Sequence, residues 1–93
     1  MDVGYVWDET KYEAVKRKHS IYFYEVVSAF EDPNGFLEED PAGYEDRWMW
    51  IGMSVTKRIL SIIATDQDLP SYRIITAFDA EEKWVDEYYK QRV

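Results

Sequence analysis

The sequence predicts a single α+β domain, with a small, mostly antiparallel sheet and helices packed on one face. Three apolar runs, at residues 47–54, 58–65 and 72–78, each have the length of a strand and are rich in Ile, Leu, Trp and Tyr. Segments with apolar residues at helical spacing lie on both sides of these runs. A length of 93 residues fits one domain, residues 1–93, with a limited core.

The N-terminal third predicts one strand followed by two helices. The short apolar run 3–7 is the expected strand, and Asp8 is a suitable N-cap for a helix over 8–18. Glu9 in the first turn and the basic residues 16–18 in the last turn suit the helix dipole. A second helix over 21–30 is predicted from the helical spacing of its apolar residues, which are Tyr22, Phe23, Val26, Val27 and Phe30.

The remaining elements follow from turn residues and apolar patterns. Residues 32–35 read Asp-Pro-Asn-Gly, a turn signal, after which a short strand is expected to open at 36–37. An acidic loop, 38–46, leads to the runs 47–54 and 58–65, and the short break 55–57 between these runs predicts an antiparallel hairpin. The run 72–78 adds a strand, and a helix over 80–92 closes the predicted order β-α-α-β-β-β-β-α.

Composition limits the function classes. The formal net charge is −8, so nucleic acid is repelled at long range and any RNA contact must rest on a local basic patch. The absence of cysteine excludes disulfides and thiolate metal sites, and fits a cytoplasmic protein. We find no signal peptide pattern, no apolar run of membrane-spanning length and no nucleotide-binding motif, so neither a membrane nor a cofactor is expected.

The acidic loop raises the question of a metal site. Glu38-Glu39-Asp40 and Glu45-Asp46 offer carboxylates, which are the ligands that Mg²⁺ prefers. Nothing in the sequence shows that they converge, so a solvated run of charge is the favoured interpretation.

The run 47–54 has apolar residues on both of its predicted faces. Three helices cannot easily cover both faces of a small sheet, which predicts that one face is left for a partner. We expect a partner helix near Trp48, Trp50 and Phe78. There are two alternatives for the tryptophans. Both could stack on RNA bases, or at least one of them could pack in the core.

An arginine begins each of the three central strands: Arg47, Arg58 and Arg73. If these strands pair, the guanidiniums would converge on one phosphate, which arginine binds through two parallel hydrogen bonds. The alternative is ordinary solubilising charge at the edges of the sheet.

Two further pairs of residues contain a side chain that could transfer a proton. His19 is the only histidine and follows Lys18 at a predicted helix end, where it would serve as an acid or base, or would only cap the helix. Glu45 precedes Arg47 by two residues, so both face one side of the strand. This pair would be a carboxylate base beside a phosphate-binding arginine, or a surface ion pair worth about 0–1 kcal/mol.

An ordered set of short segments resembles the BrnT family of bacterial type II toxins. The segments are Trp7-Asp8 with Lys11, Lys18-His19 with Ile21, Phe30 with Asp32-Pro33, Glu45 with Arg47, Ile51-Gly52-Met53-Ser54, Arg58 with Leu60, Arg73-Ile74-Ile75-Thr76-Ala77, Glu82 and Tyr88-Tyr89. The resemblance implies a RelE-like fold and a ribosome-independent, metal-independent endoribonuclease, which is a hydrolase. It also implies a small BrnA-like antitoxin as partner, in a toxin–antitoxin heterotetramer, and RNA as substrate.

The resemblance and the residue chemistry together predict one active surface, made of Lys18, His19, Glu45, Arg47, Arg58 and Arg73. Glu45 or His19 would act as the base or the acid. Lys18 and the arginines would bind the phosphate.

Four positions depart from the family pattern. Phe78 and Asp79 stand where the family usually carries basic residues, Val15 where asparagine is common, and Ser20 where glycine is common. Part of the expected cationic surface is therefore missing. The alternative function is a catalytically decayed binding module that retains only the antitoxin-binding surface.

Overall fold

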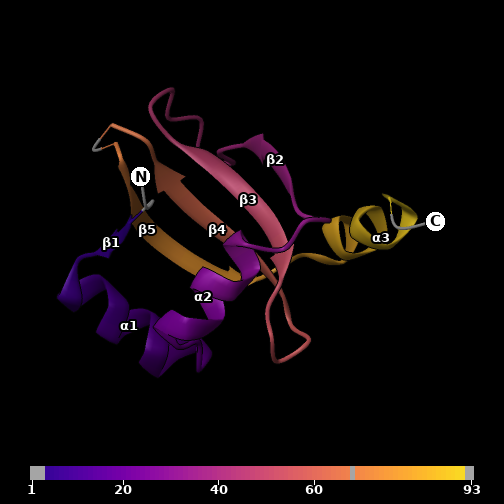
Figure 1. The fold of residues 1–93 in the computed structure, drawn as a ribbon, viewed down its shortest axis with the longest axis horizontal. Helices are drawn as coiled ribbons and strands as arrows, with labels where there is room; N and C mark the ends of the chain where they lie inside the picture. Colours follow the sequence, from indigo (N-terminus) through magenta and orange to yellow (C-terminus); the bar gives the residue numbers. More distant parts are fainter. Residues whose placement is uncertain (1–3, 68, 92–93) are drawn as a thin grey trace.

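A computed structural model describes residues 4–67 and 69–91 of the chain (Figure 1). Its elements are β1 (Gly4–Trp7), α1 (Glu9–His19), α2 (Phe23–Phe30), β2 (Phe36–Glu39), β3 (Trp48–Met53), β4 (Ile59–Thr65), β5 (Ser71–Asp79) and α3 (Glu82–Gln91). The predicted order is confirmed, with small shifts at the element ends. The predicted positions 3 and 92 lie outside the described residues.

The five strands form one sheet in the order β1-β5-β4-β3-β2. All neighbouring pairs are antiparallel except β1 and β5, which run parallel. The sheet is therefore mostly antiparallel, as predicted. All seven residues of the central strand β4 are buried, because helices or large side chains lie over both of its faces.

Local side-chain contacts fix the limits of α1 and α2. The Asp8 carboxylate accepts a hydrogen bond from the Lys11 N–H at 3.1 Å, which confirms the predicted N-cap of α1. The helix ends at Ser20, which adopts the left-handed conformation with φ 55°. The second helix begins two residues later than predicted, because the Glu25 carboxylate accepts a hydrogen bond from the Tyr22 N–H at 3.1 Å.

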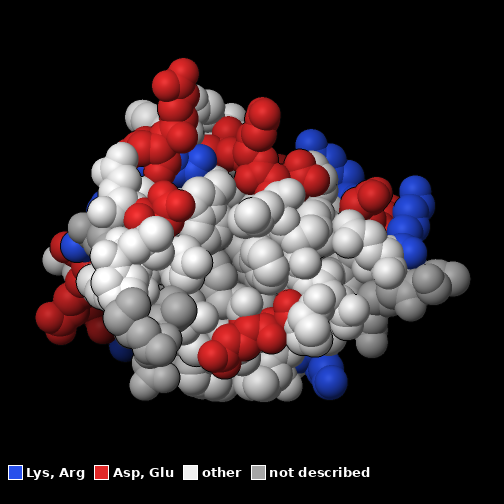
Figure 2. Space-filling model, turned by 45° about the horizontal axis from the view of Figure 1, so that its top comes forward, with Lys and Arg blue, Asp and Glu red and all other residues white. Residues whose placement is uncertain are grey.

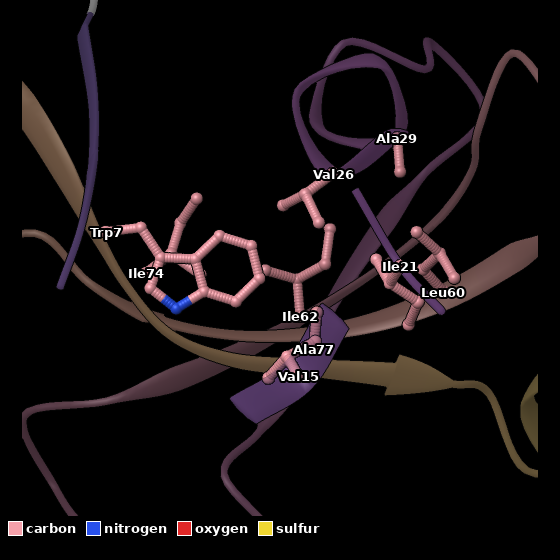
Figure 3. Packing of buried hydrophobic residues seen from close by; sticks show 9 residues of the cluster. All are labelled: Trp7, Val15, Ile21, Val26, Ala29, Leu60, Ile62, Ile74 and Ala77. Atoms are coloured by element: carbon pink, nitrogen blue, oxygen red, sulfur yellow. The ribbon is translucent and has the colours of Figure 1, made fainter. Parts of the chain in front are cut away.

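Two helices cover one face of the sheet, here called the α1/α2 face. Figure 3 shows Val26 of α2 facing Ile62 of β4 at the centre of this packing. The buried residues of the cluster are Trp7, Val15, Ile21, Val26, Ala29, Leu60, Ile62, Ile74 and Ala77. This cluster is the larger of two cores and positions both helices on β4 and β5.

The third helix belongs to the opposite face, so the prediction of helices on one face is wrong for α3. Tyr88 of α3 is buried in a second cluster with Met49 and Ile51, whose side chains point away from α1 and α2. Figure 1 shows α3 extending beyond the edge of the sheet that carries β2. Because β4 is apolar on both faces, the second face also needs cover, and α3 supplies part of it.

A close contact joins α2 to β3. The Trp50 indole Nε1 donates a hydrogen bond to the Ala29 carbonyl oxygen at 2.7 Å. Glycines make room for this arrangement, because a Cβ at Gly35 would collide with the Trp50 ring and a Cβ at Gly52 would collide with the Ala29 carbonyl. Trp50 therefore holds α2 to the sheet, which agrees with the core-packing alternative for this tryptophan.

Candidate functional site

The three strand-initial arginines lie at two different ends of the sheet. Arg47 immediately precedes Trp48 of β3, which pairs with Ala64 of β4. Thr65, the next residue of β4, pairs with Arg73 of β5, so Arg47 and Arg73 lie at the same end of the sheet. Arg58 precedes the other end of β4, a strand of seven residues that spans about 20 Å. The prediction that all three guanidiniums converge is therefore wrong for Arg58, because antiparallel neighbours begin at opposite ends.

The Arg58 side chain is fully engaged within the protein. Arginine has five N–H donors in its guanidinium, and Arg58 makes five hydrogen bonds with it. Nε and Nη2 contact the Asp79 carboxylate at 3.1 and 3.0 Å, Nη2 contacts the His19 carbonyl at 3.0 Å, and Nη1 contacts the Ser20 carbonyl at 2.8 Å and the Glu25 carboxylate at 3.5 Å. Arg58 thus satisfies two carbonyl oxygens at the C-terminal end of α1.

The electrostatic surroundings of Arg58 are also supplied by the chain itself. The hydrogen bond and charge of Asp79, with a smaller effect of Glu25, raise the pKa of the Arg58 guanidinium against the opposing effect of burial. The buried Glu25 carboxylate also accepts a hydrogen bond from the Thr56 hydroxyl at 2.9 Å. This network joins the α1–α2 junction to the turn between β3 and β4.

A small cationic pocket lies where α1 crosses β5. This α1–β5 pocket has a volume of about 350 Å³. Its lining residues are Lys11, Ala14, Val15, Lys18, His19, Ile75 and Thr76. The structure therefore brings two of the six residues of the predicted active surface, Lys18 and His19, into one pocket. It adds Lys11 and Thr76, which the sequence analysis did not select, although Lys11 precedes Lys18 by seven residues and so shares its side of α1.

The same pocket borders an open part of the sheet. The short strand β1 pairs only with Ser71 to Ile74 of β5, and β1 is the last strand on that side. Within residues 4–67 and 69–91, the backbone of β5 beyond Ile74 therefore has no strand on its outer edge, where Ile75 and Thr76 line the pocket. Unpaired strand edges present N–H groups, which are anion-binding donors.

A second pocket lies at the other end of the sheet, beside the acidic loop. This acidic-loop pocket has a volume of about 550 Å³. Its lining residues are Leu37, Glu38, Glu39, Asp40, Gly43, Tyr44, Glu45, Arg47 and Trp48. The Arg47 guanidinium lies 4.4 Å from the centre of the Tyr44 ring, and its buried Nε has no hydrogen-bond partner among the described residues.

The two pockets divide the predicted active surface. Glu45 and Arg47 line the acidic-loop pocket together, whereas Lys18 and His19 line the α1–β5 pocket, and no residue lines both. Glu45 and His19 are therefore not brought into one pocket. Arg73 lies on β5 at the same end of the sheet as Arg47.

The predicted partner residues are divided as well. Trp50 pairs with Ile62, which pairs with Ala77, so these side chains share the α1/α2 face. Phe78 pairs with Ser61 and packs in the second cluster, on the opposite face. The prediction of one partner surface that includes Trp48, Trp50 and Phe78 is therefore wrong for Phe78, because adjacent strand residues point to opposite faces.

No group of three or more His, Asp or Glu side chains within residues 4–67 and 69–91 is arranged to hold a metal ion. Over the same residues, each helix is too short or too polar to cross a membrane. The fold and the α1–β5 pocket together define the class of protein, a small α+β domain with a cationic pocket at the edge of a mostly antiparallel sheet.

A solved structure shows the same fold, and a family comparison identifies the family within this class. The crystal structure of the Brucella abortus ribonuclease toxin BrnT matches with a TM-score of 0.62 and 21% sequence identity, over 87% of this chain and 100% of that chain. This likeness shows the fold. The family described as "Ribonuclease toxin, BrnT, of type II toxin-antitoxin system" matches residues 7–83. The chain belongs to the BrnT family. Comparison with curated proteins gave no match.

Proposed function

We propose that this chain is a toxin that cleaves RNA without a metal ion and is neutralised by a BrnA-like antitoxin. The observation that carries the activity is the α1–β5 pocket, in which Lys11, Lys18 and His19 line one cavity. The RelE-like fold, the cytoplasmic location and a toxin–antitoxin heterotetramer, all expected from the family resemblance, form part of this proposal.

The chemistry of the pocket fits cleavage by the ribose 2′-hydroxyl. This reaction needs a base for the hydroxyl, a positive charge for the pentavalent phosphate and an acid for the leaving oxygen. His19 acts as the base that takes the proton of the 2′-hydroxyl, Lys11 and Lys18 supply positive charge for the phosphate, and water donates the proton that the leaving 5′-oxygen receives. The chain is acidic overall, so this local cationic pocket is what allows a polyanion to approach.

A second candidate function is a decayed toxin that keeps only the antitoxin-binding surface. The observation that favours it is the engagement of Arg58, whose donors are all occupied by groups of the chain itself. A phosphate would have to displace Asp79 before it reached this arginine. The two candidates differ in catalysis and share the fold.

The test is cleavage of a labelled single-stranded RNA by purified chain free of antitoxin, in the presence of EDTA. The proposal expects cleavage, and it expects resistance when the cleaved nucleotide carries a 2′-deoxy substitution. His19→Ala should reduce the rate by about 10²-fold or more, since positioned acid–base groups contribute about 10²–10⁴-fold. Lys11→Gln and Lys18→Gln should each reduce it as well.

A matched control is Lys90→Gln on α3, which removes one exposed positive charge outside the pocket. Its cleavage rate should equal that of the unsubstituted chain. Equal rates for His19→Ala and the control would remove His19 from the chemistry. No cleavage by the folded, unsubstituted chain would favour the decayed toxin.

A further inference from the structure

Four aromatic side chains form a continuous surface at one end of the α1/α2 face, where α2 ends at Phe30. This aromatic face consists of Tyr5, Phe30, Trp48 and Tyr72, and each side chain is partly exposed. The ring centres of Tyr5 and Phe30 lie 5.3 Å apart, and those of Trp48 and Tyr72 lie 5.7 Å apart. Phe30 connects the two pairs, since it belongs to the first pair and its ring centre lies 5.9 Å from that of Trp48 in the second.

The aromatic face continues into the acidic-loop pocket. Trp48 belongs to both, and Leu37 of β2, which is 60% exposed, also lines the pocket. Leu37 pairs with Trp50 across β2 and β3, so it points to the same side of the sheet as the aromatic face. An exposed leucine beside partly exposed aromatic rings extends the apolar surface to the edge of the sheet.

Carboxylates surround this apolar surface. Glu38, Glu39, Asp40 and Glu45 line the acidic-loop pocket, where Arg47 is the single basic residue among the described lining residues. At the other side, burial raises the pKa of the Tyr5 hydroxyl, and the negative charge of nearby Glu31 raises it further. Figure 2 shows a face of the molecule with a broad uncharged area, acidic side chains along its upper and left edges and in its lower part, and basic side chains mainly at the right.

We propose that the aromatic face and the acidic-loop pocket together bind a segment of a partner protein in which apolar residues are flanked by lysine or arginine. The apolar residues pack on Trp48, Phe30 and Leu37, and the basic residues enter the pocket among Glu39 and Glu45. This inference rests on the antitoxin-binding part of the proposed function and adds the chemistry of the partner to it.

Charge decides between a protein segment and RNA on this surface. Aromatic rings stack on nucleic acid bases as readily as they pack on apolar side chains. The phosphates of RNA, however, would lie among the carboxylates of the pocket, and like charges placed together oppose binding. The same carboxylates attract a cationic segment. This attraction raises its rate of association and fixes the register in which it binds.

The experiment uses synthetic peptides of defined composition and the full chain labelled with ¹⁵N. One peptide is an 18-residue sequence of Leu, Trp, Ser and Arg, and a matched peptide has Glu in place of every Arg. The Arg peptide should shift backbone resonances around Trp48 and Leu37 and bind less tightly at higher salt, because the attraction between charges is screened. The Glu peptide and oligouridine should leave these resonances unchanged.

Paired charge variants separate this surface from net charge alone. Glu39→Gln with Glu45→Gln should weaken binding of the Arg peptide at least tenfold. Glu81→Gln with Glu87→Gln, which makes the same change of net charge with exposed residues from the α3 region, should not weaken it. Leu37→Ala should also weaken binding. Because Leu37 is exposed, this variant keeps the fold, which Trp48→Ala would disturb.

Four results would overturn the inference: equal loss of affinity in both double variants, resonance shifts confined to other surfaces, binding of oligouridine at Trp48, or no binding of the Arg peptide. None of these results depends on RNA cleavage. The activity of the α1–β5 pocket is measured separately with His19→Ala, so failure of either proposal is recognised without the other.

Discussion

The guanidinium of Arg58 and the carboxylate of Asp79 form a bidentate pair, with Nε to Oδ1 at 3.1 Å and Nη2 to Oδ2 at 3.0 Å. The family resemblance leads one to expect a basic residue at position 79. The acidic residue found there occupies the two donors of Arg58 that a phosphate would use. Asp79 is 62% exposed, so this pair lies at the surface where a ligand can compete.

Asp79→Asn should raise RNA cleavage or RNA binding several-fold, because it removes the negative charge that occupies Arg58. The free energy of unfolding should fall by less than about 1 kcal/mol, since exposed ion pairs contribute little. Cleavage rates and urea denaturation measure the two effects. Asp86→Asn on α3 is the control of equal charge change. If both variants cleave RNA alike, Asp79 does not restrain Arg58.

Arg58→Ala should lower the free energy of unfolding by about 3 kcal/mol, because it leaves the buried Glu25 carboxylate and two carbonyl oxygens without this donor. Urea denaturation gives the value. Lys90→Ala, at an exposed position of α3, should change it by less than about 0.5 kcal/mol. A loss below 1 kcal/mol for Arg58→Ala would mean that solvent replaces its contacts.

Gly52→Ala should unfold a large fraction of the chain, because its Cβ would collide with the Ala29 carbonyl that Trp50 contacts. Near-ultraviolet circular dichroism reports the loss of packed tryptophan. Gly4→Ala is the matched substitution, since its Cβ would meet only the Ser71 side chain, with the hydroxyl at 3.1 Å, and we expect a small effect there. Equal stability of the two variants would show that α2 shifts to admit the methyl group.

Ser20→Gly should raise the free energy of unfolding by about 0.5–1 kcal/mol. Ser20 has φ 55°, a left-handed conformation that costs a residue with a Cβ about 1–2 kcal/mol, and glycine recovers part of this cost. Its carbonyl would still accept the hydrogen bond from Arg58. Thermal melting measures the gain. Ser71→Gly, at the start of a strand, should give a loss instead, and a loss at both positions would contradict the strain argument.

Local sequence signals were sufficient for most of the fold. The Asp8 N-cap, the Asp-Pro-Asn-Gly turn and the short break at 55–57 act over a few residues, so their structural effects can be predicted without knowing the rest of the chain. Lys18 and His19, which were selected for the active surface, line one pocket because they are neighbours on α1. Lys11 was not selected, although its helical spacing from Lys18 was already visible in the sequence.

The sequence by itself determined the kinds of elements, their order and the alternation of side chains along each strand. Only the tertiary structure decided which residues from distant elements meet. Strand direction separates Arg58 from Arg47, and strand register separates Phe78 from Trp50. The same packing brings Arg58 to Asp79, 21 residues away in sequence. The physical reason is that these contacts depend on how whole strands and helices are placed against one another, which no local pattern specifies.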